Sequence, residues 1–382
     1  MDKVVIFRHQ LFKVSEPFIV QQAQQLRRFE PLYLGRSRFG AAPDNGRSFS
    51  IEDDLQRRSF AQKLWQVSSR DPEPFLSALN DERPVLVHAH FGVEGVYALP
   101  LAKQLRVPLI TTFHGFDATT SPTALVRSGS PSWVNYLLFR HRLAAKGDLF
   151  LCVSDYIRKR VLAMGFPAEK THVHYMGIDT EKFQPRSPGK ERRLVLHVAR
   201  LVEKKGTEYL IRAFGSIAER VSDATLVIIG DGPLRPSLEA LASTLGLGQR
   251  IRFMGAQAHA EVIAMMRQTA VLALPSVTAK SGDAEGLGMV LLEAAAHGVP
   301  MVATAHGGIP EVVREGTTGF LVPERDIDLL AERIQRLLDN DALRHTMGAQ
   351  ARAMVQTDFN IQTQTAKLET FYDMALGREP QS

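Results

Sequence analysis

The sequence predicts an α/β protein made of two doubly wound domains, and three observations support this. Strand-like apolar runs alternate with helical patterns over residues 85–175, and a second series of the same kind covers 194–338. Such alternation is typical of a parallel sheet with helices on both faces. Residues 184–193 combine proline, glycine and charge without apolar periodicity, as linkers do. A chain of 382 residues is also long enough for two separate cores.

Composition narrows the class of protein. Apolar residues make up 45% of the chain and charged residues 23%, which is typical of globular proteins in water. The single cysteine, Cys152, excludes an intrachain disulfide and a cysteine metal cluster, and this fits a reducing cytoplasm. No apolar run is long enough to span a bilayer, and the amino terminus reads as a strand rather than a signal peptide. We therefore expect a cytoplasmic location.

The net charge of +5 is unevenly distributed along the chain. Residues 1–185 contain 24 Lys and Arg against 18 Asp and Glu, so the basic excess belongs to the first half. Within it, residues 55–68 predict a basic amphipathic helix with Trp65 beside its apolar stripe. Such a helix can lie on an anionic membrane surface, or it can simply cover a core, and the pattern leaves both interpretations open.

The stretch 281–298 begins as a loop of small and acidic residues and continues as an apolar run of strong helix formers. Gly298 and Pro300 end this run. The pattern predicts a helix that begins near Leu287.

Gly286 and Gly288 would lie in the first turn of that helix, where open backbone N–H groups and the helix dipole favour an anion. Glu285 and Glu293 flank this point, on the order of 12 Å apart if the interval is helical. That spacing suits the two ends of an extended ligand with phosphates between them. It is less suited to a paired-carboxylate hydrolase. An ordinary apolar helix with a glutamate at each end is the alternative.

Basic residues follow the strand predicted at 194–199. Arg200, Lys204 and Lys205 can contact phosphate oxygens, the arginine through its planar fork and the lysines as point charges. Gly206 then precedes the next helix. Basic loops are common in proteins, so this segment indicates a phosphate site only in combination with the loop at 285–293.

His114 is the candidate catalytic residue of the first half, because it follows a strand and precedes Gly115, which permits close backbone approach. A satisfied loop histidine is the alternative. Asp117 is placed to order the same loop. His88 and His90 could join His114 as metal ligands, but no acidic or thiol partner is spaced to complete such a site. We expect no metal.

The motifs of the second half resemble the nucleotide-binding signature of retaining glycosyltransferases of family 4, which have the two-domain GT-B fold. The matching residues are Glu285-x7-Glu293, Gly298-Val299-Pro300 and Gly307-Gly308-Ile309-Pro310-Glu311. In sequence, these motifs are most similar to those of bacterial members that build exopolysaccharides of the colanic acid type. The resemblance is specific over 190–325 and looser over 85–180, and it covers little of 1–80.

The resemblance implies two Rossmann-like domains with a cleft between them. The first, 1–185, would bind the acceptor, the second, 190–357, would bind the donor, and 358–382 would return to the first as a helix. It also implies site residues. The catalytic set would be His114, Glu285, Arg200 and Lys205, and the donor-binding set would be Arg200, Lys205, Gly255, Glu285, Gly286, Leu287, Gly288 and Glu293.

The implied function is retaining transfer of a sugar from a nucleotide-diphosphate sugar to a glycan or lipid-linked acceptor in surface polysaccharide biosynthesis. A UDP-sugar is favoured, with GDP-mannose as the alternative, and the acceptor would carry a polyprenyl diphosphate. We expect no metal, other cofactor or nucleic acid. A lipid-linked acceptor, the basic first half and the helix around Trp65 together predict a peripheral position at the inner face of the cytoplasmic membrane. Rival interpretations are a sugar-nucleotide epimerase with the same fold and a non-catalytic scaffold of a polysaccharide assembly complex.

Two departures from the family limit what carries over. Met176 stands where many relatives have asparagine in an Asn-Gly-Val/Ile-Asp turn. The first loop, 8–13, replaces a glycine-rich loop, so acceptor contacts there do not transfer.

Overall fold

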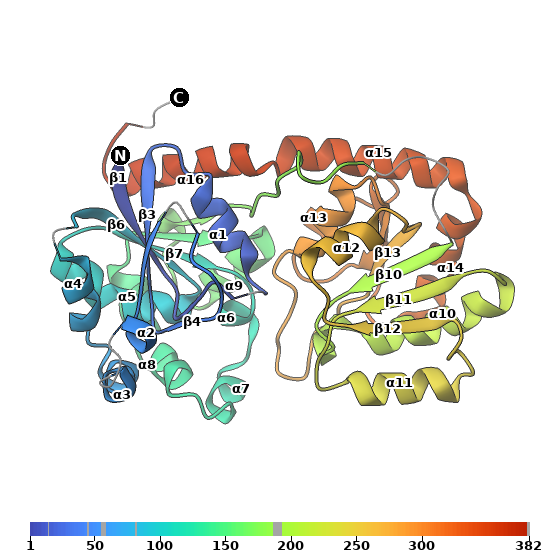
Figure 1. The fold of residues 1–382 in the computed structure, drawn as a ribbon, viewed down its shortest axis with the longest axis horizontal. Coiled ribbons are helices and arrows are strands. Elements are labelled where there is room, and N and C mark those ends of the chain that lie inside the picture. The colour runs from blue at the N-terminus through green and yellow to red at the C-terminus, as the bar shows by residue number, and fades with distance from the viewer. Residues whose placement is uncertain (14, 44–45, 55–58, 81, 186–192, 380–382) are drawn as a thin grey trace. The chain divides into compact units, whose positions relative to one another are not determined.

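The computed structural model describes residues 1–13, 15–43, 46–54, 59–80, 82–185 and 193–379. The chain divides into two compact units (Figure 1). The first consists of Met1–Gly177 together with Ile361–Ser382, and the second of Ile178–Asn360.

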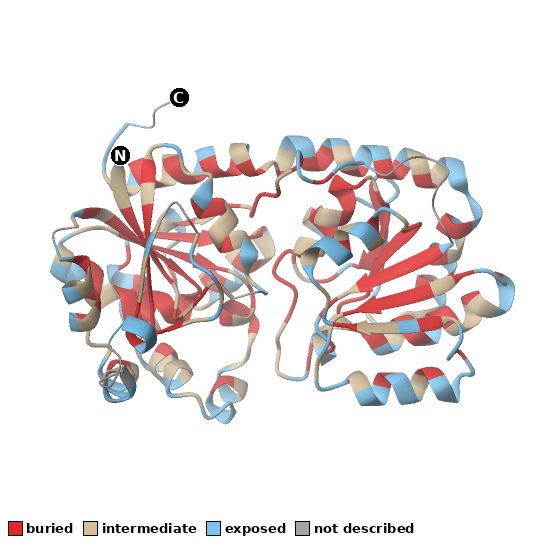
Figure 2. Cartoon of the chain, in the orientation of Figure 1, coloured by how far each residue is buried: buried red, intermediate tan, exposed pale blue. Residues whose placement is uncertain are grey.

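The first unit is built on a seven-stranded parallel sheet in the order β5-β3-β1-β6-β7-β8-β9. Most of its strands are buried over most of their length, as Figure 2 shows by their red colour, whereas the edge strands β5 and β9 are only partly buried. The strands of this sheet are β1 Asp2–Phe7, β3 Phe29–Gly35, β5 Arg47–Ser50, β6 Pro84–His90, β7 Leu109–Phe113, β8 Leu149–Cys152 and β9 Thr171–Val173. A separate two-stranded piece pairs β2, Gln10–Leu11, with β4, Ser37–Arg38.

Ten helices of the described chain belong to this unit. They are α1 Pro17–Gln24, α2 Ile51–Asp54, α3 Ser59–Ser69, α4 Glu73–Leu79, α5 Gly92–Leu105, α6 Phe116–Thr119, α7 Pro122–Arg127, α8 Pro131–Lys146, α9 Asp155–Ala163 and α16 Ile361–Ala375. The last, α16, is fixed to the unit by polar contacts. Arg28 pairs with Asp373 at 2.6 Å, and the Tyr372 hydroxyl lies 2.8 Å from Nδ1 of His88.

The second unit has a six-stranded parallel sheet in the order β12-β11-β10-β13-β14-β15. Its strands are β10 Leu194–Val198, β11 Thr225–Ile229, β12 Ile251–Gly255, β13 Val271–Leu274, β14 Met301–Thr304 and β15 Gly319–Val322. The helices are α10 Thr207–Arg220, α11 Arg235–Thr244, α12 His259–Met266, α13 Met289–Ala296, α14 Ile327–Asp339 and α15 Asp341–Asp358. Apolar faces of α10 and α14 pack on the sheet, with Phe214, Ile217 and Ile334 fully buried.

Each sheet has one point where the strand order reverses. In the first unit the chain moves outward from β1 to β3 and β5 and then returns to β6 on the other side of β1. In the second unit it moves from β10 to β11 and β12 and returns to β13 on the other side of β10. Ligands of open parallel sheets bind outside the carboxyl ends of the strands at such reversals. A ligand site is therefore expected in the loops that follow β1, β6, β10 and β13.

The predicted class, two doubly wound α/β domains, is confirmed, but several local predictions were wrong. The glycine, proline and serine content of residues 36–50 predicts a loop, but this segment contains two strands. β4 pairs with β2 in the separate two-stranded piece, and β5 forms the edge of the seven-stranded sheet beside β3. The sequence from Pro17 to Phe29 has a helical pattern that predicts one helix, but α1 ends at Gln24, because Phe29 begins the buried strand β3. The 18-residue helix α15 had no prediction, although Asn340 caps it by accepting a hydrogen bond from the Leu343 N–H.

The boundary between the units lies before the predicted linker 184–193, of which 186–192 falls outside the described residues. Residues 178–185 belong with the second unit. Ile178 forms a bridge with Asn360, and the Phe183 carbonyl accepts a hydrogen bond from Arg352 at 2.8 Å. The four residues 55–58 of the predicted Trp65 helix also lie outside the described chain, and α3 begins at Ser59.

Candidate functional site

The loops that follow β10 and β13 are locked together at the reversal of the second sheet. Gly206 has a φ of +63°, and a Cβ at this position would lie 1.8 Å from the Pro275 carbonyl oxygen. The Val277 N–H donates to the Lys204 carbonyl at 2.8 Å. Only glycine permits so close an approach of two backbones with this φ. The approach brings the basic segment Lys204-Lys205 beside the loop that contains Glu285.

Two ion pairs join these loops. Lys205 Nζ lies 2.5 Å from a carboxylate oxygen of Glu285, and Lys204 Nζ lies 3.0 Å from Asp283. The Glu285 side chain is only 10% exposed. Burial alone would raise its pKa, but the charges of Lys205 and Lys204 outweigh that cost and lower the pKa to about 2. Glu285 is therefore an ionised, buried carboxylate with a lysine in direct contact.

The backbone of Glu285 is held as closely as its side chain. Its carbonyl accepts a hydrogen bond from the Gly308 N–H at 3.1 Å. Gly307 has a φ of +58°, and a Cβ there would lie 2.2 Å from the same carbonyl oxygen. The Gly307-Gly308 pair therefore has a structural reason in this chain: it lets the loop after β14 lie against the Glu285 peptide.

The helix after this loop begins later than predicted. Its first residue is Met289, and Gly288 is the N-cap with a φ of +85°, outside the helical region. Gly286 and Leu287 thus precede the helix instead of forming its first turn, and Leu287 is buried. Half of the interval from Glu285 to Glu293 is not helical, so the separation estimated from helical rise does not apply.

The other predicted donor-site residues lie on neighbouring elements. Arg200 is exposed just after β10, and its guanidinium makes no ion pair with any residue the structure describes. Gly255 ends β12 with a φ of +69°, and its carbonyl accepts from the Gly230 N–H. Glu293 lies on α13 with Oε1 3.5 Å from Nε2 of His259. Among the predicted residues, Lys205 and Glu285 are in direct contact in the described structure. None of the described contacts links Arg200, Gly255 or Glu293 to this pair.

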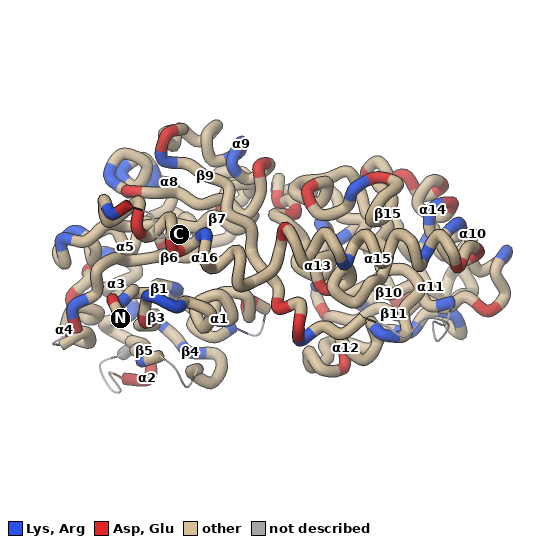
Figure 3. Tube along the Cα trace, turned by 90° about the horizontal axis from the view of Figure 1, so that it is seen from above, with Lys and Arg blue, Asp and Glu red and all other residues tan. Residues whose placement is uncertain are grey.

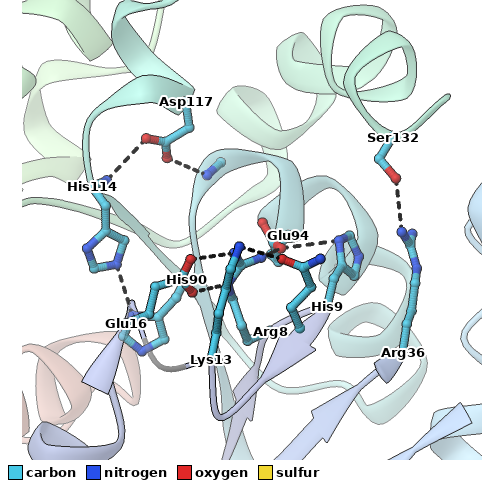
Figure 4. Close-up of polar contacts among 12 residues, drawn as sticks. Arg8, His9, Lys13, Glu16, Arg36, His90, Glu94, His114, Asp117 and Ser132 are labelled. Atoms are coloured by element: carbon cyan, nitrogen blue, oxygen red, sulfur yellow. Dashed lines mark hydrogen bonds and ion pairs between the residues drawn. The ribbon is translucent and has the colours of Figure 1, made fainter. Parts of the chain in front are cut away.

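His114 lies at the carboxyl edge of the first sheet, in the loop after β7 (Figure 4). Its Nε2 is 3.0 Å from Nδ1 of His90, which ends β6. Burial, with the Arg8 charge nearby, holds the pKa of His114 well below its usual range, so the ring is neutral at neutral pH. Asp117 orders the loop: its carboxylate accepts backbone N–H groups of His114, Gly115 and Gly92.

A buried ion cluster beside His114 was not predicted. Arg8, just after β1, bonds Glu16 at 2.8 Å and contacts Glu94 (Figure 4). Its guanidinium carbon also lies 4.4 Å from the ring centre of Phe91. Glu94 is fully buried on α5. Burial would raise its pKa, but Arg8 and His9 lower it to about 2. A glutamate inside the otherwise apolar start of α5 was the signal in the sequence. Arg8 thus lies at the carboxyl end of β1, directly beside the loop that contains His114.

Comparisons with known proteins identify the family. Residues 22–182 match the model of Glycosyltransferase Family 4, and residues 178–354 match that of Glycosyl transferases group 1. A GDP-mannose-dependent phosphatidylinositol monomannoside mannosyltransferase of Mycobacterium tuberculosis is 36% identical over 74% of this chain and 74% of its own length. The chain belongs to glycosyltransferase family 4.

This family 4 chain also resembles exopolysaccharide enzymes. It is 38% identical to WcaL of Salmonella typhimurium, whose name assigns it to colanic acid biosynthesis, over 72% of this chain. It is 34% identical to the amylovoran biosynthesis glycosyltransferase AmsK of Erwinia amylovora, over 71%. The matches span 66% and 65% of those two proteins, just under two thirds of their lengths. The predicted family resemblance is confirmed.

Solved structures give the fold of this glycosyltransferase. HepE of Anabaena, solved in complex with UDP-glucose, superposes with a TM-score of 0.78 at 21% identity and covers 98% of this chain and all of its own. A sucrose-phosphate synthase of Thermosynechococcus elongatus also superposes with a TM-score of 0.78. The predicted GT-B fold is therefore confirmed, whereas the cleft between the domains stays a prediction.

Two further properties of this family 4 chain concern metals and membranes. Both ring nitrogens of His88 already have partners, the hydroxyls of Tyr372 and Thr112. Within the described ranges, no cluster of three His, Cys, Asp or Glu residues is arranged to hold a metal ion. Nor does any described helix have the length and apolar character needed to cross a membrane.

Proposed function

We propose that this chain transfers a sugar, with retention, from a nucleotide-diphosphate sugar to a saccharide acceptor in surface polysaccharide biosynthesis. The observation that supports it best is the Lys205–Glu285 pair at the strand reversal of the second unit. Desolvating a carboxylate and an ammonium is costly, and an apolar pair would be at least as stable. The family, the position at the reversal and the backbone contacts around Glu285 together favour a functional reason for these charges.

The two cations have different roles in the proposed mechanism. Negative charge develops on the nucleoside diphosphate as it leaves, and fixed positive groups stabilise that charge in the transition state. Arg200 has no ion pair among the described residues, so its guanidinium is available to a phosphate. Lys205 is shared between Glu285 and the diphosphate.

Glu285 holds hydroxyl groups of the transferred sugar, while Glu293 holds the ribose. We assign no residue as a covalent nucleophile. The proposed reaction is therefore a front-face displacement, in which no covalent enzyme intermediate forms. The mechanism uses no metal ion or other cofactor. His114, neutral and fixed by His90, is proposed to contact the donor sugar.

The donor is proposed to be a UDP-sugar, with a GDP-sugar as the second option. Support for UDP comes from HepE, which was solved with UDP-glucose. Support for GDP-mannose comes from the mannosyltransferase of Mycobacterium tuberculosis, which is more similar in sequence. The acceptor is proposed to be lipid-linked, with a polyprenyl diphosphate as the carrier. Support for a lipid carrier comes from the mannosyltransferase of Mycobacterium tuberculosis, whose name gives phosphatidylinositol monomannoside.

A donor screen tests the function. Isothermal titration should show that UDP or GDP binds at least about tenfold more tightly than the matching monophosphate, about 1.4 kcal/mol, because two cations face the diphosphate. The matching UDP- or GDP-sugar should be hydrolysed slowly without acceptor, with the anomeric configuration of the released sugar retained. Conversion of a UDP-sugar into its epimer would indicate an epimerase instead. Failure to bind any nucleotide would leave a scaffold as the better interpretation.

Helix α3 in the first unit has its apolar face turned outward. Phe60, Leu64 and Trp65 are 77%, 57% and 61% exposed, whereas the polar Gln66 is fully buried and accepts a hydrogen bond from Arg36. On α8, which contacts α3, Leu138 is 58% exposed. An apolar helix face that is left exposed while a polar side chain is buried indicates a surface with an external apolar partner.

Cations accompany this surface. Arg142 and Lys146 continue along α8 from Leu138, both are exposed, and neither has an ion pair within the described part of the chain. Figure 3 marks the Lys and Arg positions along the chain, with the Asp and Glu positions that lie among them. We propose that this α3–α8 surface, defined by Phe60, Leu64, Trp65, Leu138, Arg142 and Lys146, docks on the inner face of the cytoplasmic membrane, where anionic lipids attract basic segments.

Flotation with lipid vesicles should show binding to vesicles that contain phosphatidylglycerol and little binding to neutral phosphatidylcholine, most clearly at low salt. The double substitution Leu64→Ser with Trp65→Ser should abolish flotation, since it removes the apolar part of the surface. Leu234→Ser is the matched control, because Leu234 is exposed in the second unit. Equal flotation of the double variant and the control would refute the assignment of this surface.

A further inference from the structure

In the second unit, the imidazole of His306 and the carboxylate of Glu324 connect three loops next to Glu285 by hydrogen bonds. His306 follows β14 and is 4% exposed, and its Nε2 accepts a hydrogen bond from the Glu285 N–H at 3.2 Å. Its Nδ1 lies 2.7 Å from Oε1 of Glu324, just after β15. Glu324 also accepts the N–H and hydroxyl of Thr278, in the loop after β13, at 2.8 and 2.9 Å. The loops after β13, β14 and β15 therefore meet at one site.

The contacts determine the tautomer of His306. A backbone N–H can only donate, so Nε2 must be the unprotonated nitrogen. The remaining proton is then on Nδ1, where the Glu324 carboxylate accepts it. This is the arrangement in which a carboxylate orients a histidine through its second nitrogen. Both backbone polar groups of Glu285 are therefore hydrogen-bonded: its N–H donates to His306, and its C=O accepts from the Gly308 N–H.

We propose that His306 and Glu324 are a positioning pair that fixes Glu285 for the reaction, and this rests on the function proposed above. Neither residue needs to touch the donor. Their effect is on the orientation of the carboxylate that does, and a displacement on the order of 1 Å at such a group costs about 100-fold in rate. The pair also gives a reason for the histidine before Gly307-Gly308. The glycines let the loop after β14 approach the Glu285 carbonyl, and His306 accepts the Glu285 N–H from the same loop.

The arrangement depends on the protonation state of His306. A protonated imidazole has N–H groups at both nitrogens, so Nε2 would face the Glu285 N–H as a second donor and the contact would break. The charged groups around the ring are Glu324 and the Glu285 carboxylate, with Lys205 beyond Glu285 and Arg325 on Glu324.

The tautomer is testable without any activity. Nitrogen-15 spectra of the full chain should show His306 with an unprotonated Nε2 and a protonated Nδ1 at neutral pH. Amide hydrogen exchange at Glu285 should accelerate in His306→Leu, which has no acceptor, and less in His306→Gln, whose side-chain oxygen can replace Nε2. A protonated Nε2, or unchanged exchange in His306→Leu, would overturn the pair whatever the protein's activity proves to be.

Kinetics then separate positioning from general stability. His306→Leu should lower kcat by about 10- to 100-fold and change the Kd of the nucleoside diphosphate by less than about threefold. His306→Gln should recover part of kcat, because its side-chain oxygen can accept the Glu285 N–H in place of Nε2. His297→Leu is the matched control, a buried histidine of the same unit that bonds the Gln184 carbonyl. Equal losses of kcat in His306→Leu and His297→Leu would also overturn the proposal.

Discussion

Replacing Glu285 by glutamine is expected to lower kcat by at least about 100-fold, the scale of losing one electrostatic contact made in the transition state. The ring of the transferred sugar changes charge and shape during the reaction, so a carboxylate that holds its hydroxyls acts mainly on the transition state. Glutamine keeps the size of the side chain and removes its charge. Steady-state kinetics with the full donor measure the effect.

The same substitution should leave the affinity for the bare diphosphate unchanged or make it tighter. In the structure Lys205 is paired with Glu285, so the carboxylate competes with phosphate for the ammonium group. Glu285→Gln removes that competitor. Calorimetry with the diphosphate alone, without a sugar, isolates this effect from catalysis.

Glu293→Ala is the comparison. Ribose is bound alike in substrate and product, so this variant should raise the donor KM and weaken diphosphate binding together, with a smaller effect on kcat. If Glu285→Gln lost diphosphate affinity to the same extent as Glu293→Ala, the proposed orientation of the donor along α13 would be wrong.

The sequence was sufficient for those features that local patterns encode. Alternating strands and helices predicted both sheets, and the position of Lys205 and Glu285 after two strands placed each at a carboxyl edge. Their contact was not predictable, because it joins residues 80 positions apart and depends on which strands are neighbours. A sequence pattern gives strand ends, whereas the strand order decides which ends meet.

Other misses have local causes. The late start of α13 depends on the left-handed conformation of Gly288, which composition alone does not reveal because glycine tolerates both helical and non-helical backbone. The Arg8–Glu94 pair joins β1 to α5 across 86 positions. His306 gave no separate signal beside Gly307, since its role arises from a hydrogen bond to a residue in another loop.

Lys205→Ala is expected to weaken diphosphate binding by about 1.5–3 kcal/mol, the usual contribution of a hydrogen bond to a charged group. This corresponds to a roughly 10- to 150-fold rise in Kd. Lys205→Arg should lose less, because it retains the charge while changing its geometry. Lys204→Ala is the matched control: Lys204 is the adjacent lysine, and it pairs with Asp283 instead of Glu285. A Kd that rises as much in Lys204→Ala as in Lys205→Ala would assign the phosphate contact to the wrong lysine.

A double-mutant cycle distinguishes a phosphate contact from a purely structural ion pair. If Lys205 serves only to neutralise buried Glu285, then Lys205→Ala leaves an uncompensated carboxylate, and adding Glu285→Gln should restore both the free energy of unfolding and diphosphate binding. If Lys205 contacts the diphosphate, Glu285→Gln should restore stability but not affinity, because no cation returns to that position. We expect the second result, measured by denaturant unfolding and by calorimetry on the same four proteins. Recovery of affinity in the double variant would reduce Lys205 to the counter-ion of Glu285 and leave Arg200 as the proposed phosphate ligand.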